Sequence, residues 1–424
     1  MNILHLNTYD WEGGAAKAAY RLHMGLEQQG VKSQMLVAKK TSTNKNTFQL
    51  NPHIPDFYNL IRAKLDAIQL LFYPNRKKTI FSPAILPSSV LSHKVLSNTD
   101  IIHLHWLTAG YVNVEALGAQ KRPLLWTLHD MWAFTGGCHY DEGCGKYIQS
   151  CGACPHLGSN RENDLSRSVW DRKKRAWQSL NMTIVAPSRW LASSARKSSL
   201  FSKHRIEVIP YGLDTDIFMP QEKKRARKSL NLPLNSRFIL FGAINATNDE
   251  RKGFNYLKAM LQALAHENYS QSIELLVFGA SKVAAPPLAG INVHFIGQLR
   301  DETQLSILYS AADLFVLPSI QDNLPNTVLE SLACGTPVVA FDVGGMPDMV
   351  DHEVNGYLAR AFDEKDLAHG VKWIMEDQSR YLELSKAARK KALNEYSLEV
   401  QAKRYLDIYE EVMLSKKAAD DLSN

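Results

Sequence analysis

The sequence lacks any apolar run long enough to cross a bilayer. Of its 424 residues 45% are hydrophobic and 22% charged, yet no stretch reaches the roughly 18 to 20 consecutive apolar residues of a membrane-spanning helix. The N-terminus runs directly into a strand-like segment at residues 2–6, without the layout of a signal peptide. We therefore expect a cytoplasmic protein whose contact with a membrane, if any, is peripheral and at the inner face.

A strong charge excess is also missing. The net charge is +6, and we find neither the aromatic-basic signature nor the zinc-finger pattern of a nucleic-acid-binding module. Lysine and arginine gather at residues 76–78, 172–175 and 223–228. These clusters are either solvated surface or attraction sites for anionic lipid or phosphate, and the sequence leaves both open.

Short, β-rich apolar segments alternate with helical patterns in both halves of the chain. Strands are expected at residues 2–6, 34–38, 101–105, 124–129, 183–187 and 207–209, and then at 238–243, 274–278, 293–296, 314–317 and 337–341. This alternation predicts an α/β protein with parallel sheets covered by helices. The length suits two domains, and a turn-rich passage at residues 210–220 predicts their junction.

Residues 57–73 interrupt the alternation. Their apolar residues recur at helical spacing and are followed by Pro74 and three basic residues. This pattern predicts a helix packed within the first domain or, alternatively, a helix that lies on a membrane surface or over an acceptor.

A glycine pair, Gly13 and Gly14, stands between the first predicted strand and a helix expected at residues 15–29. Such a pair lets a phosphate or sugar approach the backbone at a helix N-terminus. It also simply permits a tight turn, so the pair alone does not decide between the two.

Histidines lie near the ends of two predicted strands: His103, His105 and His129. Asp130 follows His129 directly at the strand exit. Parallel sheets place their functional groups at this edge, so His129 is the candidate for catalysis, with core packing as the alternative.

Four of the five cysteines fall close together, at Cys138, Cys144, Cys151 and Cys154. In a cytosolic protein such grouping favours zinc over disulfides, and four thiolates would complete a tetrahedral structural site. The first pair is spaced more widely than usual in zinc sites. Free thiols or redox-sensitive pairs are the alternative.

Residues 314–347 predict a strand, a loop, a short helix at 326–333 and a second strand. Asp322 and Glu330 bracket the loop and the helix. Further back, Arg251 and Lys252 precede a helix expected from residue 254, where they and the helix N-terminus could hold an anion. Two exposed loop charges are the alternative.

These motifs resemble those of the retaining glycosyltransferases of family 4, which have the GT-B fold. The resemblance spans nearly the whole chain and is most specific in the run 318–345, with its Cys-Gly-Thr-Pro-Val-Val-Ala segment, and in the junction at residues 210–218. It implies two facing Rossmann-like domains with an active-site cleft between them. Residues 1–210, completed by a helix at 398–424, would form the acceptor domain, and residues 211–397 the donor domain. The cysteine-bearing insertion, about 136–158, resembles that of a polysaccharide-assembly subgroup.

The resemblance also implies donor-site roles for particular residues. Glu330 would hold the donor ribose hydroxyls, and the backbone of Asn323 and Leu324 would lie around the phosphates. Arg251 and Lys252 would neutralise the diphosphate.

On the other side of the implied cleft, Gly13 and Gly14 would approach the diphosphate. His129 would touch the transferring sugar and Asp322 would lie near it, which makes His129, Asp322 and Lys252 the candidate catalytic residues. No metal would be required for catalysis.

The implied activity is retaining transfer of a hexosyl unit from a nucleotide-diphosphate sugar to a glycan or lipid-linked acceptor. A sugar-nucleotide epimerase and a non-catalytic nucleotide-sugar-binding protein are the alternatives. Two departures from the family pattern bear on the donor: Asp322 stands where the family has glutamate, and Gly242-Ala243 where it has Gly-Arg.

Overall fold

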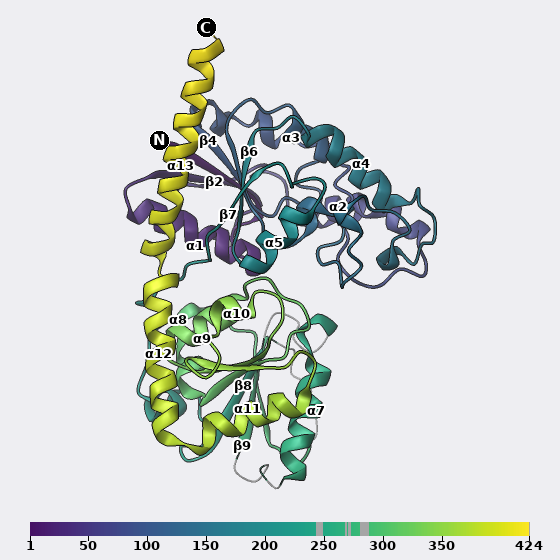
Figure 1. Cartoon of the computed structure of the whole chain (residues 1–424). Coiled ribbons are helices and arrows are strands. Elements are labelled where there is room, and N and C mark those ends of the chain that lie inside the picture. The colour runs from purple at the N-terminus through teal and green to yellow at the C-terminus, as the bar shows by residue number, and fades with distance from the viewer. Residues whose placement is uncertain (243–248, 268, 270–272, 280–287, 424) are drawn as a thin grey trace. The chain divides into compact units, whose positions relative to one another are not determined.

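The computed structural model describes residues 1–423 except 243–248, 268, 270–272 and 280–287 (Figure 1). The chain divides into two compact units. The N-terminal unit comprises Met1–Pro210 and Gln401–Asn424, and the C-terminal unit comprises Tyr211–Val400. Among the described helices none has the length and apolar character needed to span a membrane.

The N-terminal unit is built on a parallel sheet of seven strands in the order β3-β2-β1-β4-β5-β6-β7. Its strands are β1 Asn2–Tyr9, β2 Lys32–Lys39, β3 Thr47–Gln49, β4 Ile101–Leu104, β5 Leu124–Thr127, β6 Met182–Ala186 and β7 Arg205–Val208. The central strands β4, β5 and β6 are buried along their whole length, because helices cover both faces of a parallel sheet. The six strands expected in this half are confirmed with small shifts at their ends, and β3 is additional.

Helices and short 3-10 segments complete this unit. They are α1 Gly14–Gln28, α2 Phe57–Asp66, α3 Val114–Gly118, α4 Leu165–Trp177, α5 Arg189–Lys197, α13 Leu398–Ser423, η1 Ile68–Phe72, η2 Val90–Ser92, η3 Lys94–Asn98, η4 Trp132–Phe134, η5 Lys146–Ile148 and η6 Pro155–Leu157. The buried rings of Tyr405 and Tyr409 fix α13 against Ile3 and Leu22. From Gln401 onward α13 therefore belongs to the N-terminal unit, although it is remote from that unit in sequence.

The C-terminal unit has a parallel sheet of six strands in the order β10-β9-β8-β11-β12-β13. Its strands are β8 Arg237–Gly242, β9 Ile273–Phe278, β10 Val293–Gly297, β11 Leu314–Leu317, β12 Val338–Phe341 and β13 Gly356–Ala359. The helical segments are α6 Lys223–Ser229, η7 Glu250–Lys252, α7 Phe254–His266, α8 Glu302–Ala311, α9 Asn326–Ala333, α10 Met346–Met349, α11 Glu364–Glu376 and α12 Gln378–Tyr396. The five expected strands are confirmed, and β13 is additional. Ala243 lies outside the described residues.

Helix starts follow from capping side chains. Asp164 accepts hydrogen bonds from two amides at the start of α4, and Asp363 does the same for α11. Ser188 caps α5 in the same manner. Each cap satisfies amides that the helix itself leaves without acceptors.

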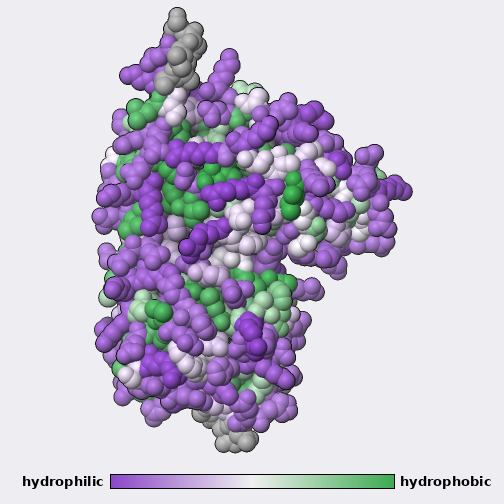
Figure 2. Space-filling model, viewed as in Figure 1, coloured by the Kyte–Doolittle hydropathy of each residue, from purple (hydrophilic) through white to green (hydrophobic). Residues whose placement is uncertain are grey.

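The segment at residues 57–73 differs from the packed helix that its periodicity predicts. It forms α2 and η1, in which Asp66 and Leu70 are the buried residues, while Leu71 and Phe72 are 80% and 84% exposed. The predicted helix is thus confirmed and is joined to the N-terminal unit through Asp66 and Leu70, but the apolar stripe that was expected to pack inside the unit is exposed. Figure 2 shows a visible face that is mostly hydrophilic, with apolar side chains gathered in smaller areas.

Candidate active site

In the C-terminal unit, two cations meet a buried carboxylate. Lys252 Nζ lies 2.6 Å from Asp322 Oδ2, and Arg251 Nη1 lies 3.3 Å from the same oxygen. Asp322 is 6% exposed. The structure thus brings together three of the residues named from the sequence, and the interpretation of Arg251 and Lys252 as exposed loop charges is wrong.

Two glycines allow the loops to approach closely enough for this contact. Gly253 has φ +74°, and a Cβ there would lie 1.7 Å from the carbonyl oxygen of Pro318. Gly344 has φ +57°, and a Cβ there would lie 2.1 Å from the carbonyl oxygen of Asp322. Both positions exclude any other residue without rearrangement, since left-handed backbone and close approach are what glycine permits.

Burial and charge act in opposite directions on this group. Burial alone raises the pKa of Asp322, but the charges of Lys252 and Arg251 outweigh it and hold that pKa below its usual value. Burial lowers the pKa of Lys252, partly offset by the charge of Asp322. Because the two partners stabilise one another's charges, the site is an ion pair at neutral pH.

Glu330 lies on α9 and is 3% exposed. Tyr309 on α8 donates its hydroxyl to Glu330 Oε2 at 3.0 Å, which fixes the orientation of the carboxylate. In the preceding loop Asn323 and Leu324 are buried, and the Asn323 amide donates to Asp322 Oδ1 at 3.0 Å. Tyr309 was not identified from the sequence, where no pattern links it to Glu330.

In the N-terminal unit, three histidines form a chain of ring contacts. His5 Nδ1 lies 2.9 Å from His105 Nε2, and His105 Nδ1 lies 3.1 Å from His129 Nε2. The parallel pairing of β1 with β4 sets His5 opposite His103 and thereby brings His5 close to His105. The involvement of His5 was missed from the sequence, because it depends on strand register.

The protonation pattern of this chain follows from its buried end. His5 Nε2 has no hydrogen-bond partner among the described residues, so a proton there would be a buried donor without an acceptor. The favoured arrangement puts one proton on Nδ1 of each ring, with His129 Nε2 accepting from His105. Burial lowers the pKa of His129 to about 4 and those of His5 and His105 well below the usual value. All three rings are thus neutral at pH 7.

His5, His103 and His105 place ring nitrogens within 4.8 Å of one another. His103, however, uses both nitrogens, at 2.6 Å from the Tyr409 hydroxyl and 2.8 Å from Thr127 Oγ1. A metal would have to break one of these buried hydrogen bonds. The arrangement therefore fits a structural hydrogen-bond network better than a metal centre.

Asp130 connects the His129 loop to the cysteine-bearing insertion. His139 Nδ1 lies 2.6 Å from Asp130 Oδ2, and Trp106 Nε1 donates to the same oxygen at 3.1 Å. Burial raises the pKa of Asp130, but His139 and the surrounding hydrogen bonds lower it by more. The carboxylate is charged and held from several sides.

Gly13 has φ +100° and precedes α1, whose first residue is Gly14. A Cβ at Gly13 would meet no atom within 4 Å. The positive φ accounts for glycine here, and the side facing away from the backbone is open within this unit. That geometry fits the approach of a ligand to the helix N-terminus.

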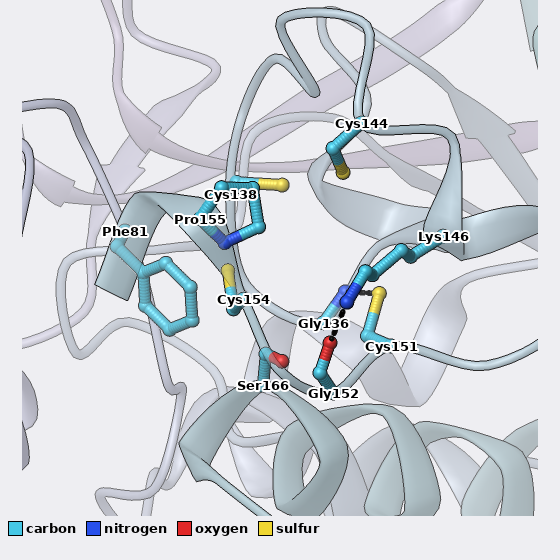
Figure 3. Close-up of a pocket in the computed structure, with 10 residues that line it drawn as sticks. All are labelled: Phe81, Gly136, Cys138, Cys144, Lys146, Cys151, Gly152, Cys154, Pro155 and Ser166. Atoms are coloured by element: carbon cyan, nitrogen blue, oxygen red, sulfur yellow. Dashed lines mark hydrogen bonds between the residues drawn. The ribbon is translucent and has the colours of Figure 1, made fainter. Parts of the chain in front are cut away.

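The four cysteines converge on one pocket, which Figure 3 shows together with Phe81 and Lys146. All four are free thiols. Burial raises the pKa of Cys151 to about 12, with a smaller opposing effect of the Gly136 amide. The sequence grouping thus corresponds to a spatial one.

Two family models match adjacent parts of the chain. The model described as "Glycosyltransferase Family 4" matches residues 12–217, and that described as "Glycosyl transferases group 1" matches residues 222–391. The chain belongs to the family 4 glycosyltransferases.

Similar proteins agree with this membership. The glycosyltransferase is 28% identical over 327 residues to D-inositol 3-phosphate glycosyltransferase of Thermobispora bispora, covering 74% of this chain and 71% of the relative. It is 25% identical over 364 residues to the putative colanic acid biosynthesis glycosyl transferase WcaC of Escherichia coli, covering 80% and 83%.

Among solved structures, HepE of Anabaena in complex with UDP-glucose matches with a TM-score of 0.66 and 16% identity, over 97% of this chain and 100% of that one. At this identity the likeness concerns the fold. The glycosyltransferase has the two-domain α/β architecture of the GT-B type.

Proposed function

We propose that this glycosyltransferase transfers a hexosyl unit from a nucleotide-diphosphate sugar to a glycan or lipid-linked acceptor, with retention of anomeric configuration, in polysaccharide assembly. The observation that carries the proposal is the contact of Arg251 and Lys252 with the buried carboxylate of Asp322. The two cations stand directly before helix α7. Support for the donor class comes from HepE, which was solved with UDP-glucose. Support for the pathway comes from the relative WcaC.

The donor diphosphate would bind at the cationic pair. Cleavage of the sugar–phosphate bond builds negative charge on the leaving diphosphate, and cations held in place before the reaction stabilise that charge without reorganisation. Asp322 holds Lys252 and Arg251 in position. On binding, the phosphate oxygens would share these cations with the carboxylate.

Glu330 would accept hydrogen bonds from the donor ribose hydroxyls. Tyr309 restricts its carboxylate to one orientation, which reduces the ordering cost of binding. The buried loop amides at Asn323 and Leu324 would lie around the phosphates. These roles make the C-terminal unit the donor domain.

The N-terminal unit would be the acceptor domain and would also supply Gly13, Gly14 and His129. His129, neutral and carrying its proton on Nδ1, would donate a hydrogen bond to the transferring sugar. Transfer would retain the anomeric configuration without a nucleophile from the enzyme. The leaving phosphate would take the proton of the acceptor hydroxyl. Catalysis would then rest on positioning and charge stabilisation, with no metal required.

A donor panel distinguishes transfer from the other activities. Purified enzyme is incubated with several nucleotide-diphosphate sugars, with and without glycan acceptors. Release of nucleoside diphosphate that rises with acceptor supports transfer. An isomerised donor would instead indicate an epimerase, and binding without turnover would indicate a non-catalytic protein.

Replacing Glu330 with alanine is expected to weaken donor binding about ten- to a hundredfold, because a hydrogen bond to a charged group contributes about 1.5 to 3 kcal/mol. Titration calorimetry with the nucleoside diphosphate measures this. Glu383→Ala, at an exposed position of α12, is the matched control. Donor affinity in Glu330→Ala equal to that of the parent would show that the ribose assignment is wrong.

An apolar surface on α2 and η1 fits a peripheral membrane contact. It consists of Phe57, Tyr58, Leu60, Ile61, Leu65, Ile68, Leu71 and Phe72, each at least 36% exposed. Lys64, Lys77 and Lys78 are exposed alongside it in the sequence. Apolar side chains next to cations suit an anionic bilayer surface, where a lipid-linked acceptor would be found.

The double variant Leu71→Ser with Phe72→Ser is expected to bind vesicles at least about a hundredfold more weakly, since each of the two side chains contributes about 1.5 to 3 kcal/mol when it is buried. Cosedimentation with vesicles containing phosphatidylglycerol measures the effect. Leu382→Ser removes an apolar side chain that is 48% exposed in the other unit and should bind like the parent. Equal binding by all three proteins would exclude this surface as the contact.

A further inference from the structure

The proposed transfer leaves one chemically distinctive group without a role, the cysteine cluster of Cys138, Cys144, Cys151 and Cys154. All four residues line the same pocket (Figure 3). Three of them are 5–7% exposed, and Cys144 is half-buried. Four thiols around one small space in a single insertion are an unusual arrangement for cysteines that only pack.

We propose that this pocket is a structural zinc site in which the four thiolates of the cysteine cluster are the ligands. Zinc prefers thiolate sulfur, and four protein ligands close its tetrahedral shell. With no position left for water or substrate, the ion would stabilise the insertion and take no part in sugar transfer. The proposal is independent of the donor site.

The backbone already holds the cluster together. Lys146 Nζ donates to the carbonyl oxygens of Gly152 at 2.9 Å and Ala153 at 2.8 Å. This joins the turn that follows Cys144 to the turn between Cys151 and Cys154. The two cysteine-bearing turns are thus brought together by a side chain that is not itself a ligand.

One thiol also has the amide contact common in metal–thiolate sites. The Gly136 amide donates to Cys151 Sγ at 3.1 Å, and a Cβ at Gly136 would lie 2.6 Å from the Cys151 Cβ. Only glycine permits this approach. An amide that points at sulfur stabilises the negative charge a thiolate ligand carries.

Binding requires a short inward movement. In the described part of the chain no three of these sulfurs lie within 4.8 Å of one another, whereas Zn–S bonds of about 2.3 Å put sulfurs about 3.8 Å apart. Cys144, between Gly143 and Gly145, is the most exposed ligand. Rotation of its side chain and a shift of this glycine-flanked turn would bring it inward.

The ion would also support the His129 loop. Cys138 precedes His139, whose ring holds Asp130 at 2.6 Å. A ligand bond at Cys138 would restrict the chain at that point. Through Cys138 and His139, zinc would thereby help to fix the position of Asp130, the residue next to His129.

Metal analysis of the full chain, purified under reducing conditions and dialysed against zinc sulfate, tests the proposal. We expect about one zinc per chain. Cys144→Ser removes the ligand with the least packing and should retain less than about a tenth of that zinc after competition with a chromophoric chelator, as expected when one of four thiolates is lost. Cys334→Ser, at the buried cysteine of the other unit, should retain all of it.

Cobalt substitution provides a second readout that does not depend on a variant. The chain loaded with Co²⁺ should show the intense visible bands and the sulfur-to-metal charge-transfer bands of a tetrahedral thiolate site. Parent protein that binds neither ion while its thiols titrate freely would overturn the proposal. So would two disulfides within the cluster, or a Cys144→Ser protein that holds zinc as tightly as the parent.

Discussion

Lys252→Ala is expected to weaken binding of the nucleotide-diphosphate donor about a hundredfold. Truncating one partner of a buried, hydrogen-bonded charge pair costs about 3 kcal/mol, which corresponds to about a hundredfold in Kd. Here the loss has two sources. The diphosphate loses the cation that lies 2.6 Å from Asp322. The buried Asp322 carboxylate then keeps Arg251 as a charge partner, so that Arg251 is shared between the carboxylate and the diphosphate.

Calorimetric titration with the nucleoside diphosphate measures the Kd, and a thermal unfolding scan separates loss of affinity from loss of fold. Lys365→Ala, at an exposed position of α11, is the matched control and should bind like the parent. Lys252→Arg keeps the charge and should recover part of the affinity. If Lys252→Ala bound donor within twofold of the parent, the cationic pair would not be the diphosphate site.

His129→Ala is expected to lower turnover about a hundred- to ten-thousandfold, within the range for a side chain that exchanges or shares a proton with the reacting groups. The donor KM should change little, because the ring is proposed to act on the transferring sugar and not on the nucleotide. Steady-state kinetics separate kcat from KM. His369→Ala, at an exposed position of α11, is the control, and a kcat for His129→Ala within twofold of the parent would contradict the assignment.

The pH profile tests the charge state of this histidine. Burial lowers the pKa of His129 to about 4, so the neutral ring takes up a second proton and becomes charged only as the pH falls through that value. We therefore expect no inflection in kcat near pH 6.5 that depends on His129. An inflection there that disappears in His129→Ala would show that the ring is exposed to solvent and titrates at the ordinary histidine pKa.

The sequence predicted the sheets well because proline and glycine residues stand where the apolar segments end. Strand β11 and helix α9 have the expected bounds, since Pro318 ends the strand and Gly335 follows the helix. Strands β3 and β13 were not predicted. Each is short and lies at a sheet edge, and depends on pairing with its neighbour, a contact that local pattern does not contain.

The candidate residues were visible one by one, but their contacts were not. Lys252 and Asp322 are 70 residues apart, and they meet because Gly253 and Gly344 let their loops approach Pro318 and Asp322. Periodicity alone also predicted that the apolar stripe of residues 57–73 is packed, whereas that stripe is exposed. An apolar stripe at helical spacing indicates what a helix would bury, without indicating whether any partner covers it.

By itself the sequence determined the α/β class, the family, the grouping of four cysteines and the residue types able to bind a diphosphate. Only the tertiary structure decided that Lys252 and Arg251 share one carboxylate, that Tyr309 holds Glu330, and that His129 ends a chain of buried rings. The reason is physical. Local pattern records which faces must be buried, whereas a site is formed by strand register and loop approach between segments that the sequence keeps apart.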